Sequence, residues 1–112
     1  YKERFMTDIN NPKEELINAG LRVVAFSGNA RSNFLEALDL AKACKFDEAD
    51  QYIKMGLENL DLAGQAQKDF LANEAEGSRE GLDFLAIHAQ DHYMTTLLLR
   101  DLINNLIDIY KK

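Results

Sequence analysis

The feature that most constrains the fold of this chain is the scarcity of helix breakers. Its 112 residues include a single proline, Pro12. Proline lacks a backbone donor and clashes with the preceding turn, so it sits at helix starts and is excluded from helix interiors. Beyond Pro12 the chain can therefore form helices much longer than the usual length of about three turns. We expect a fold made of a few long helices.

The first predicted helix begins at Pro12 and runs to about residue 44. Asn11, Pro12 and Glu14 supply a capping side chain, a proline at the first helical position and a carboxylate at the third. Apolar and small residues then recur at intervals typical of one helix face. They are Ile17, Leu21, Val24, Gly28, Leu35 and Leu38.

Two further apolar stripes predict helices over about 47–73 and about 83–110. The intervening segment NEAEGSREGLD gathers glycine and serine, so we expect a loop there, with Asp83 capping the last helix. No segment alternates with period two for long enough to be a strand. The predicted fold class is therefore all-α, an antiparallel up-down-up three-helix bundle. We treat residues 1–112 as one domain, with 1–11 as a flexible N-terminal extension.

Charge and cysteine content exclude several classes of protein. The net charge of −6 and the pI near 4.8 argue against binding to duplex nucleic acid or to an anionic membrane. No apolar run approaches the roughly 18 residues of a membrane span, and no secretion signal is evident. The lone cysteine, Cys44, is typical of a reducing compartment, and we expect it to be a packing residue and not a nucleophile. These features favour a cytoplasmic protein.

The last predicted helix is apolar on two sides. A surface helix needs one apolar stripe of about 100°. The second stripe therefore favours a symmetric homo-oligomer, in which a further copy of the chain covers it. The alternative is that both stripes fit inside one tight core. One stripe contains Asp91, Thr95, Leu98, Leu102 and Leu106, and the other contains His88, His92, Leu99, Ile103 and Tyr110.

Asp91 is unusual because it extends an apolar stripe. An isolated buried carboxylate is costly, so it should find a proton, a cation or a hydrogen-bond donor. If the stripe is a symmetric interface, copies of Asp91 would meet and would share a cation or raise their pKa. Alternatively, Asp91 lies at the end of the stripe in water.

The segment IHAQDHYMTT holds both histidines of the chain, His88 and His92, with Asp91 between them. Residues at this spacing share one face of a helix. The pair could have no task beyond packing. It could bind zinc, although a catalytic zinc needs three protein ligands and no third is obvious. One histidine could be a general base, although no hydrolase motif accompanies it.

A fourth interpretation is that one imidazole carries a phosphoryl group. A neutral ring nitrogen is nucleophilic at pH 7 without prior deprotonation. A second histidine one turn away can donate to a phosphoryl oxygen, and a position near the start of a helix favours added negative charge. In the first predicted helix, Gly28 is expected to allow close packing of another helix or a partner protein in preference to a role in the site. Arg31, one turn away, could meet a phosphate, but we expect a solvated or ion-paired surface residue.

The stretch IHAQDHYMTTLLLRDL resembles the histidine motif of the lactose/cellobiose-type enzyme IIA components of the bacterial phosphoenolpyruvate-dependent sugar phosphotransferase system. The resemblance extends to SGNARSNFLEAL and FDEADQYI and covers about residues 15–112. It implies a three-helix subunit assembled as a homotrimer. It also implies a phosphotransferase component that acts on a β-linked disaccharide system, and the SGNARS segment favours cellobiose over lactose.

The same resemblance assigns roles to individual residues. His88 would accept the phosphoryl group from the phosphocarrier HPr and pass it to a cysteine of the IIB component. A membrane IIC component would then move the sugar. Gln90 and His92 would support the imidazole, and Asp91 would meet its copies around a structural Mg²⁺, one per trimer. The alternative function is a non-catalytic helical oligomer with a metal site formed by His88, Asp91 and His92.

Overall fold

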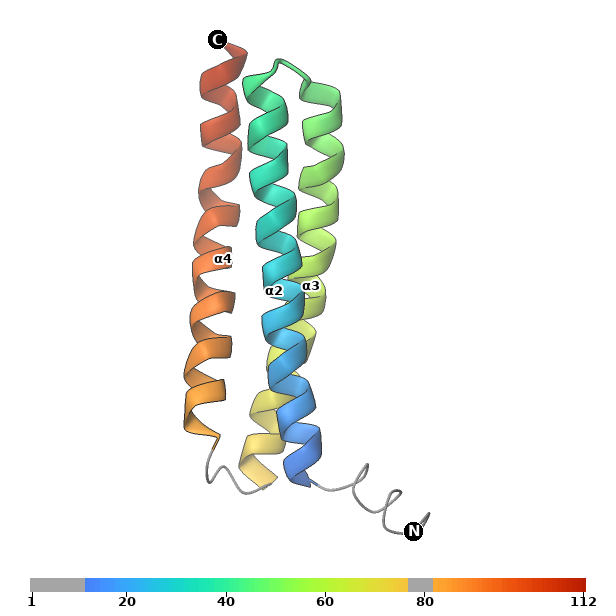
Figure 1. The fold of residues 1–112 in the computed structure, drawn as a ribbon, viewed down its shortest axis with the longest axis vertical. Coiled ribbons are helices and arrows are strands. Elements are labelled where there is room, and N and C mark those ends of the chain that lie inside the picture. Colours follow the sequence, from blue (N-terminus) through green and yellow to red (C-terminus); the bar gives the residue numbers. More distant parts are fainter. Residues whose placement is uncertain (1–11, 77–81) are drawn as a thin grey trace.

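A computed structural model describes residues 12–76 and 82–112, and within these ranges the chain forms three α-helices and no strand. The helices are α2 (Pro12–Lys42), α3 (Phe46–Glu76) and α4 (Asp83–Lys111). Figure 1 shows α2 and α4 running in the same direction, with α3 running opposite to both. The predicted all-α, up-down-up three-helix bundle is therefore confirmed.

The boundaries differ from the predicted ones at the loop between α3 and α4. α3 continues to Glu76, so the expectation of a loop from residue 73 is wrong for its first four positions. Alanine and glutamate are good helix formers and extend the helix there. Asp83 is the first residue of α4 and not its cap, because Leu82 occupies that position without a side-chain hydrogen bond. The predictions for residues 1–11 lie outside the described residues.

The turn between α2 and α3 corrects the expectation for Cys44. This residue is exposed and has a φ of 61°. Its N–H donates to the carbonyl of Ala41, and the N–H of Lys45 donates to the carbonyl of Leu40, each at 2.9 Å. This pair of bonds is the Schellman motif that ends many helices, with its left-handed residue just past the helix. Cys44 is therefore a helix-terminating residue at the end of the bundle and not part of the core.

Small residues in the core bring the helices close together. The largest fully buried side chain is Phe34, whose ring lies over Gly56 of α3. A Cβ on Gly56 would approach that ring to 2.5 Å, so close contact between α2 and α3 requires glycine there. The main buried cluster consists of Ala30, Phe34, Ala37, Ala41, Ala49, Ile53, Leu60, Ala63, Ile103 and Ile107.

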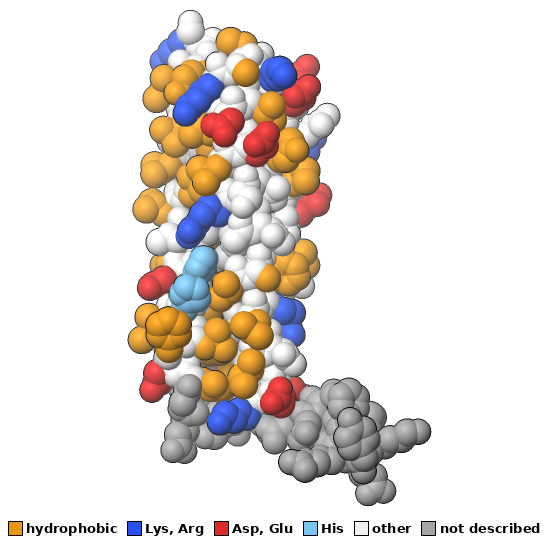
Figure 2. Space-filling view, viewed as in Figure 1, with side chains coloured by type: hydrophobic (Ala, Val, Ile, Leu, Met, Phe, Trp, Pro, Cys, Tyr) orange, Lys and Arg blue, Asp and Glu red, His pale blue; other side chains and the backbone are white. Residues whose placement is uncertain are grey.

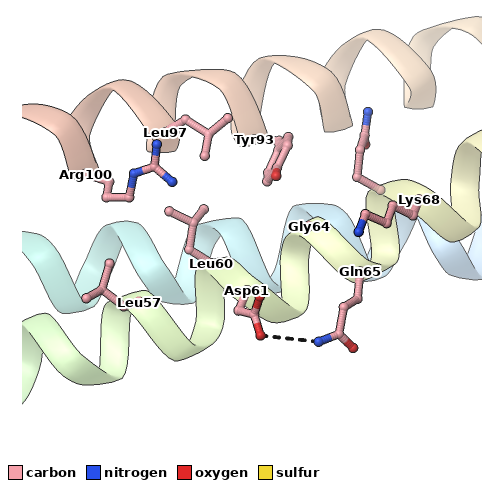
Figure 3. Close-up of a pocket in the computed structure, with 10 residues that line it drawn as sticks. Leu57, Leu60, Asp61, Gly64, Gln65, Lys68, Tyr93, Leu97 and Arg100 are labelled. Atoms are coloured by element: carbon pink, nitrogen blue, oxygen red, sulfur yellow. Dashed lines mark hydrogen bonds between the residues drawn. The ribbon is translucent and has the colours of Figure 1, made fainter.

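α4 packs mainly on α2 and touches α3 little. The space between α3 and α4 holds two grooves of about 360 and 380 Å³. Figure 3 shows the first, where Leu60 and Gly64 of α3 face Tyr93 and Leu97 of α4. The second includes Gln90 and Asp91 of α4. No helix in the described ranges is both long enough and apolar enough to cross a membrane.

Candidate functional site

His88 lies in the second turn of α4 and is exposed. Its ring stacks on Phe84, one turn earlier, with centroids 5.8 Å apart and planes 9° apart. One turn later the His92 ring meets it edge-on, with centroids 4.5 Å apart. The two neighbours restrict the plane of the His88 ring while leaving it open to solvent. Figure 2 shows the histidine side chains, in pale blue, at the surface.

His92 is half-buried, and its pKa is lowered from 6.5. Burial is the main cause, the positive charges of His88 and Arg31 add to it, and the carboxylate of Asp91 opposes it. His92 is therefore neutral at pH 7. Its Nδ1 atom is buried and has no hydrogen-bond partner in the described part of the chain. An unpaired buried N–H is rarer than an unpaired acceptor, so this environment favours the tautomer that carries its proton on Nε2.

Two threonines that the sequence analysis did not single out hold this part of α4 against α2. The Thr96 hydroxyl lies 2.6 Å from the carbonyl oxygen of His92 and 3.4 Å from that of Ser27 in α2. The Thr95 hydroxyl donates to the carbonyl of Asp91 at 2.7 Å. Threonine commonly bonds to the carbonyl one turn back in a helix. The four-residue spacing between His92 and Thr96 could therefore have predicted this contact from the sequence.

Of the two α2 residues weighed above, Arg31 acts electrostatically on the histidine pair, because its charge helps to lower the pKa of His92. Arg31 is half-buried, and its Nη2 donates to Thr95 Oγ1 at 2.6 Å. Among the ion pairs found in the described ranges none involves Arg31. Of the two predicted alternatives, ion pairing therefore finds no support there, and a partly solvated residue remains. Gly28 packs closely against no other helix of the described part of the subunit, because a Cβ there would meet no atom within 4 Å. Close approach of a partner protein at Gly28 stays a prediction.

Gln90 is exposed, and its side-chain oxygen accepts a hydrogen bond from Nε2 of Gln67 in α3. Gln67 is a second residue that sequence reasoning missed, because it lies on a different helix and in no recognisable motif. The bond connects α3 to α4 next to the histidines. It turns the carbonyl oxygen of Gln90 toward α3 and leaves the amide N–H groups as donors on the other side.

The two stripes of α4 have different environments. Leu99 and Ile103 of the histidine stripe face the core, whereas Leu98 of the aspartate stripe is 58% exposed. The alternative that both stripes fit inside one core is therefore wrong. Figure 2 shows apolar side chains along the outer edge of the molecule, where α4 lies. The exposed large apolar residues of α4 are Phe84, Ile87, Met94, Leu98, Leu102, Leu106, Ile109 and Tyr110.

Asp91 is exposed on this outer side of α4. The outer stripe of α4 consists of Ile87, Asp91, Thr95, Leu98, Leu102 and Leu106. It does not converge with His88 and His92, because no group of three metal-ligating side chains occurs among residues 12–76 and 82–112. A single subunit thus offers one carboxylate at this place. The proposed metal site of the alternative function, built from one chain, finds no support in this geometry.

Comparison with known proteins defines the class of this chain. The family described as "PTS system, Lactose/Cellobiose specific IIA subunit" matches residues 18–111. The chain belongs to this family and is a phosphotransferase component with a phosphocarrier role in a sugar phosphotransferase system.

Individual relatives agree with the family match. A "PTS system lactose-specific EIIA component" of Staphylococcus epidermidis is 45% identical over 100 residues, which span 89% of this chain and 96% of the relative. The proteins of the same name from Staphylococcus aureus and Streptococcus mutans are 44% and 41% identical, over 89% of this chain and 97% and 96% of the relatives.

Proposed function

We propose that His88 accepts a phosphoryl group from phosphorylated HPr and passes it to a cysteine of a IIB component. The observation that carries this proposal is the open imidazole held between Phe84 and His92. Two protein partners must reach the same atom in turn, which requires an exposed ring in a fixed orientation. The membrane IIC component would act after the IIB component, and the phosphoryl chain from phosphoenolpyruvate would operate in the cytoplasm.

The chemistry consists of two balanced displacements at phosphorus. A neutral ring nitrogen of His88 attacks, its N–P bond forms, and the N–P bond of the donor histidine breaks. The donor ring recovers the electron pair and takes up a proton, while His88 loses the proton on its other nitrogen. In the second step a cysteine thiolate attacks, the S–P bond forms, the N–P bond of His88 breaks, and His88 regains its electron pair and a proton.

Gln90 and His92 would support the transferred group and not react with it. The Nε2–H tautomer of His92 can donate to a phosphoryl oxygen, and the amide of Gln90 has donors that its contact with Gln67 leaves available. Fixed donors aimed at developing charge are the main device of phosphoryl-transfer sites. In this tautomer the nucleophilic lone pair of His92 lies on the buried Nδ1 atom, so His92 offers a donor to the phosphoryl group without competing with His88 as a nucleophile.

The substrate class that we propose is a β-linked disaccharide. The SGNARS segment resembles cellobiose-type members, whereas the relatives above are named lactose-specific. The site on this chain contacts protein partners and no sugar, so the choice between the two sugars belongs to the membrane component of the same system.

The function is tested by phosphate transfer in a reconstituted system. The protein, phosphoenolpyruvate, enzyme I and HPr are mixed, and acid-labile phosphate on the protein is measured before and after a IIB component is added. We expect uptake by the wild type and by His92→Ala, slower in the latter, and none by His88→Ala. Uptake by His88→Ala at the wild-type level would refute the assignment.

We further propose that the outer stripe of α4 forms a homotrimer with Asp91 at its axis. The stripe is exposed and largely apolar along the length of the helix. A large, contiguous exposed apolar surface normally marks an interface. Three copies of Asp91 would offer carboxylate oxygens only, which suit a hard cation such as Mg²⁺. The residues present therefore fit one structural Mg²⁺ per trimer, whose role would be to offset the charge of the three carboxylates.

A further inference from the structure

Four glycines occur inside the helices of the described ranges, and three of them are explained by contacts within the subunit. A Cβ on Gly20 would lie 2.9 Å from the Leu85 side chain, and one on Gly64 would lie 3.1 Å from the Tyr93 hydroxyl. Gly56 lies under the Phe34 ring, as described above. Gly28 is the exception, because a Cβ there meets nothing within 4 Å. Glycine in a helix interior is less stable than alanine, so contacts within the described part of the subunit give Gly28 no reason to be glycine.

The surroundings of Gly28 place it within the docking range of His88. The carbonyl of the preceding residue, Ser27, contacts Thr96, which follows His88 by about 12 Å along α4. A protein–protein contact at the small, transient end covers about 600 Å² on each partner, which is a disc of roughly 14 Å radius. With the distance of about 8–10 Å between packed helix axes added, Gly28 lies roughly 16 Å from His88. This distance is shorter than the diameter of that disc, roughly 28 Å, so one docked protein can cover both residues.

The face around Gly28 is open and apolar. Leu21 and Leu35 lie two turns before and after Gly28 on the same side of α2, and they are 53% and 47% exposed. The outer stripe of α4, by contrast, runs through Ile87 and Leu98 and is the surface assigned above to a second copy of the chain. The two surfaces belong to different helices, so Gly28 need not be covered by the assembly.

The charge at this face identifies the kind of partner. Arg31 lies one turn after Gly28, is half-buried and holds only the neutral hydroxyl of Thr95 among the described residues. An arginine has five N–H donors, so most of its capacity remains for an anionic group. The chain as a whole carries a net charge of −6, which would repel a phosphorylated protein, and a cation without a carboxylate partner offsets that repulsion locally.

From these observations we infer that Gly28 is the point of closest approach for the phosphorylated donor protein, and that Arg31 beside it is the cationic contact for that donor. This inference rests on the proposed phosphocarrier function. Gly28 would admit donor backbone or side-chain atoms against α2, and Arg31 would leave Thr95 to pair with an anionic group on the donor.

The test compares Gly28→Gln with Ala43→Gln, a matched control at an exposed alanine just past the far end of α2, about 22 Å from Gly28 along the helix. Transfer is measured from phosphorylated HPr, to a IIB component, and from phosphoramidate, a small-molecule donor that needs no docking. For Gly28→Gln we expect kcat/KM for HPr to fall about tenfold, with phosphoramidate labelling and oligomeric mass unchanged. Ala43→Gln should stay within about twofold of the wild type in all assays.

Three results would overturn the inference. Wild-type rates with HPr in Gly28→Gln would show that nothing approaches this position, and a loss confined to transfer to the IIB component would assign the surface to the acceptor. A change in oligomeric mass would assign it to a second copy of the chain.

Arg31→Gln should lower donor transfer and weaken its salt dependence, whereas Arg31→Lys should restore most of both. Failure of the proposed function gives different results: either the wild type accepts no phosphate from HPr, or the His88→Ala variant accepts as much phosphate as the wild type.

Discussion

At the scale of single residues, the exposed His88 ring lies between Phe84 and His92, and Arg31 of α2 reaches the same helix through Thr95. His88, Asp91 and His92 could be singled out because histidine is rare in this chain and because helical spacing puts the three on adjacent positions of one turn. Phe84 obeys the same spacing, yet an aromatic residue near a helix start is ordinary and gives no signal. Arg31 belongs to another helix, so its contact with Thr95 depends on how α2 and α4 pack, which a single sequence does not encode locally.

The protonation of His92 gives a prediction at this scale. Its pKa lies below 6.5, because burial and the nearby charges of His88 and Arg31 outweigh Asp91. The folded state then binds fewer protons than the unfolded state, so stability falls as pH drops from 6.5 toward the lowered pKa. A proton NMR titration of the ring with metal chelated should show a midpoint below that of a model histidine. A midpoint above 6.5 would contradict the environment described for this ring.

Replacing Phe84 with alanine tests the orientation of His88. The Phe84 side chain is 81% exposed, so the change should cost less than about 1.5 kcal/mol of stability. It removes the surface on which the His88 ring stacks, and we expect slower phosphate uptake with an unchanged amount at completion. Phe84→Tyr keeps the stacking surface and serves as the control, which should retain the wild-type rate.

At the scale of the helices, periodicity predicted existence, order and direction well because long stretches lack breakers. Periodicity did not predict where a helix ends, because the last residues depend on helix propensity and on the backbone conformation just past the helix. Residues 74–76 favour helix intrinsically, so α3 continues to Glu76, the residue before the first glycine of this segment, Gly77. Cys44 was misassigned because its role is set by a left-handed backbone conformation at the end of α2, which usually belongs to glycine or asparagine. The exposure of Gly28 likewise could not be read from spacing, since all four helical glycines fit the same pattern.

Two glycine-to-alanine changes should have opposite effects on stability. Gly56→Ala forces a Cβ to 2.5 Å from the buried Phe34 ring and should destabilise the protein by about 1–3 kcal/mol. Gly28→Ala meets open space and should stabilise it by up to about 1 kcal/mol. Urea unfolding of both variants at one protein concentration measures the difference. Equal effects would mean that α2 and α3 do not pack as closely as described.

At the scale of the whole molecule, the uneven packing of the helices determines which surfaces remain for partners. Because α4 sits on α2 and barely meets α3, it keeps an exposed apolar stripe on its outer side and an exposed histidine on its flank. The sequence anticipated the excess apolar surface of this helix. It could not show which stripe faces the core, because both have the same period. Assembly and phosphate exchange can therefore use different surfaces of one helix.

The proposed trimer should depend on a divalent cation through Asp91. Carboxylates that meet at an axis repel one another unless a cation offsets their charge, so a chelator should shift the wild type toward monomer and Mg²⁺ should reverse the shift. In Asp91→Leu the repulsion is absent, and the mass measured by analytical ultracentrifugation should not respond to chelator. A chelator response that persists in Asp91→Leu would place the cation elsewhere.

The most direct test of the central claim is to locate the phosphate on the protein. After incubation with phosphoenolpyruvate, enzyme I and HPr, phosphorus NMR and peptide mass spectrometry at neutral to alkaline pH would identify the modified residue. We predict a phosphoramidate on a ring nitrogen of His88, with His92 unmodified. Phosphate found on His92, or on any residue other than His88, would contradict the account.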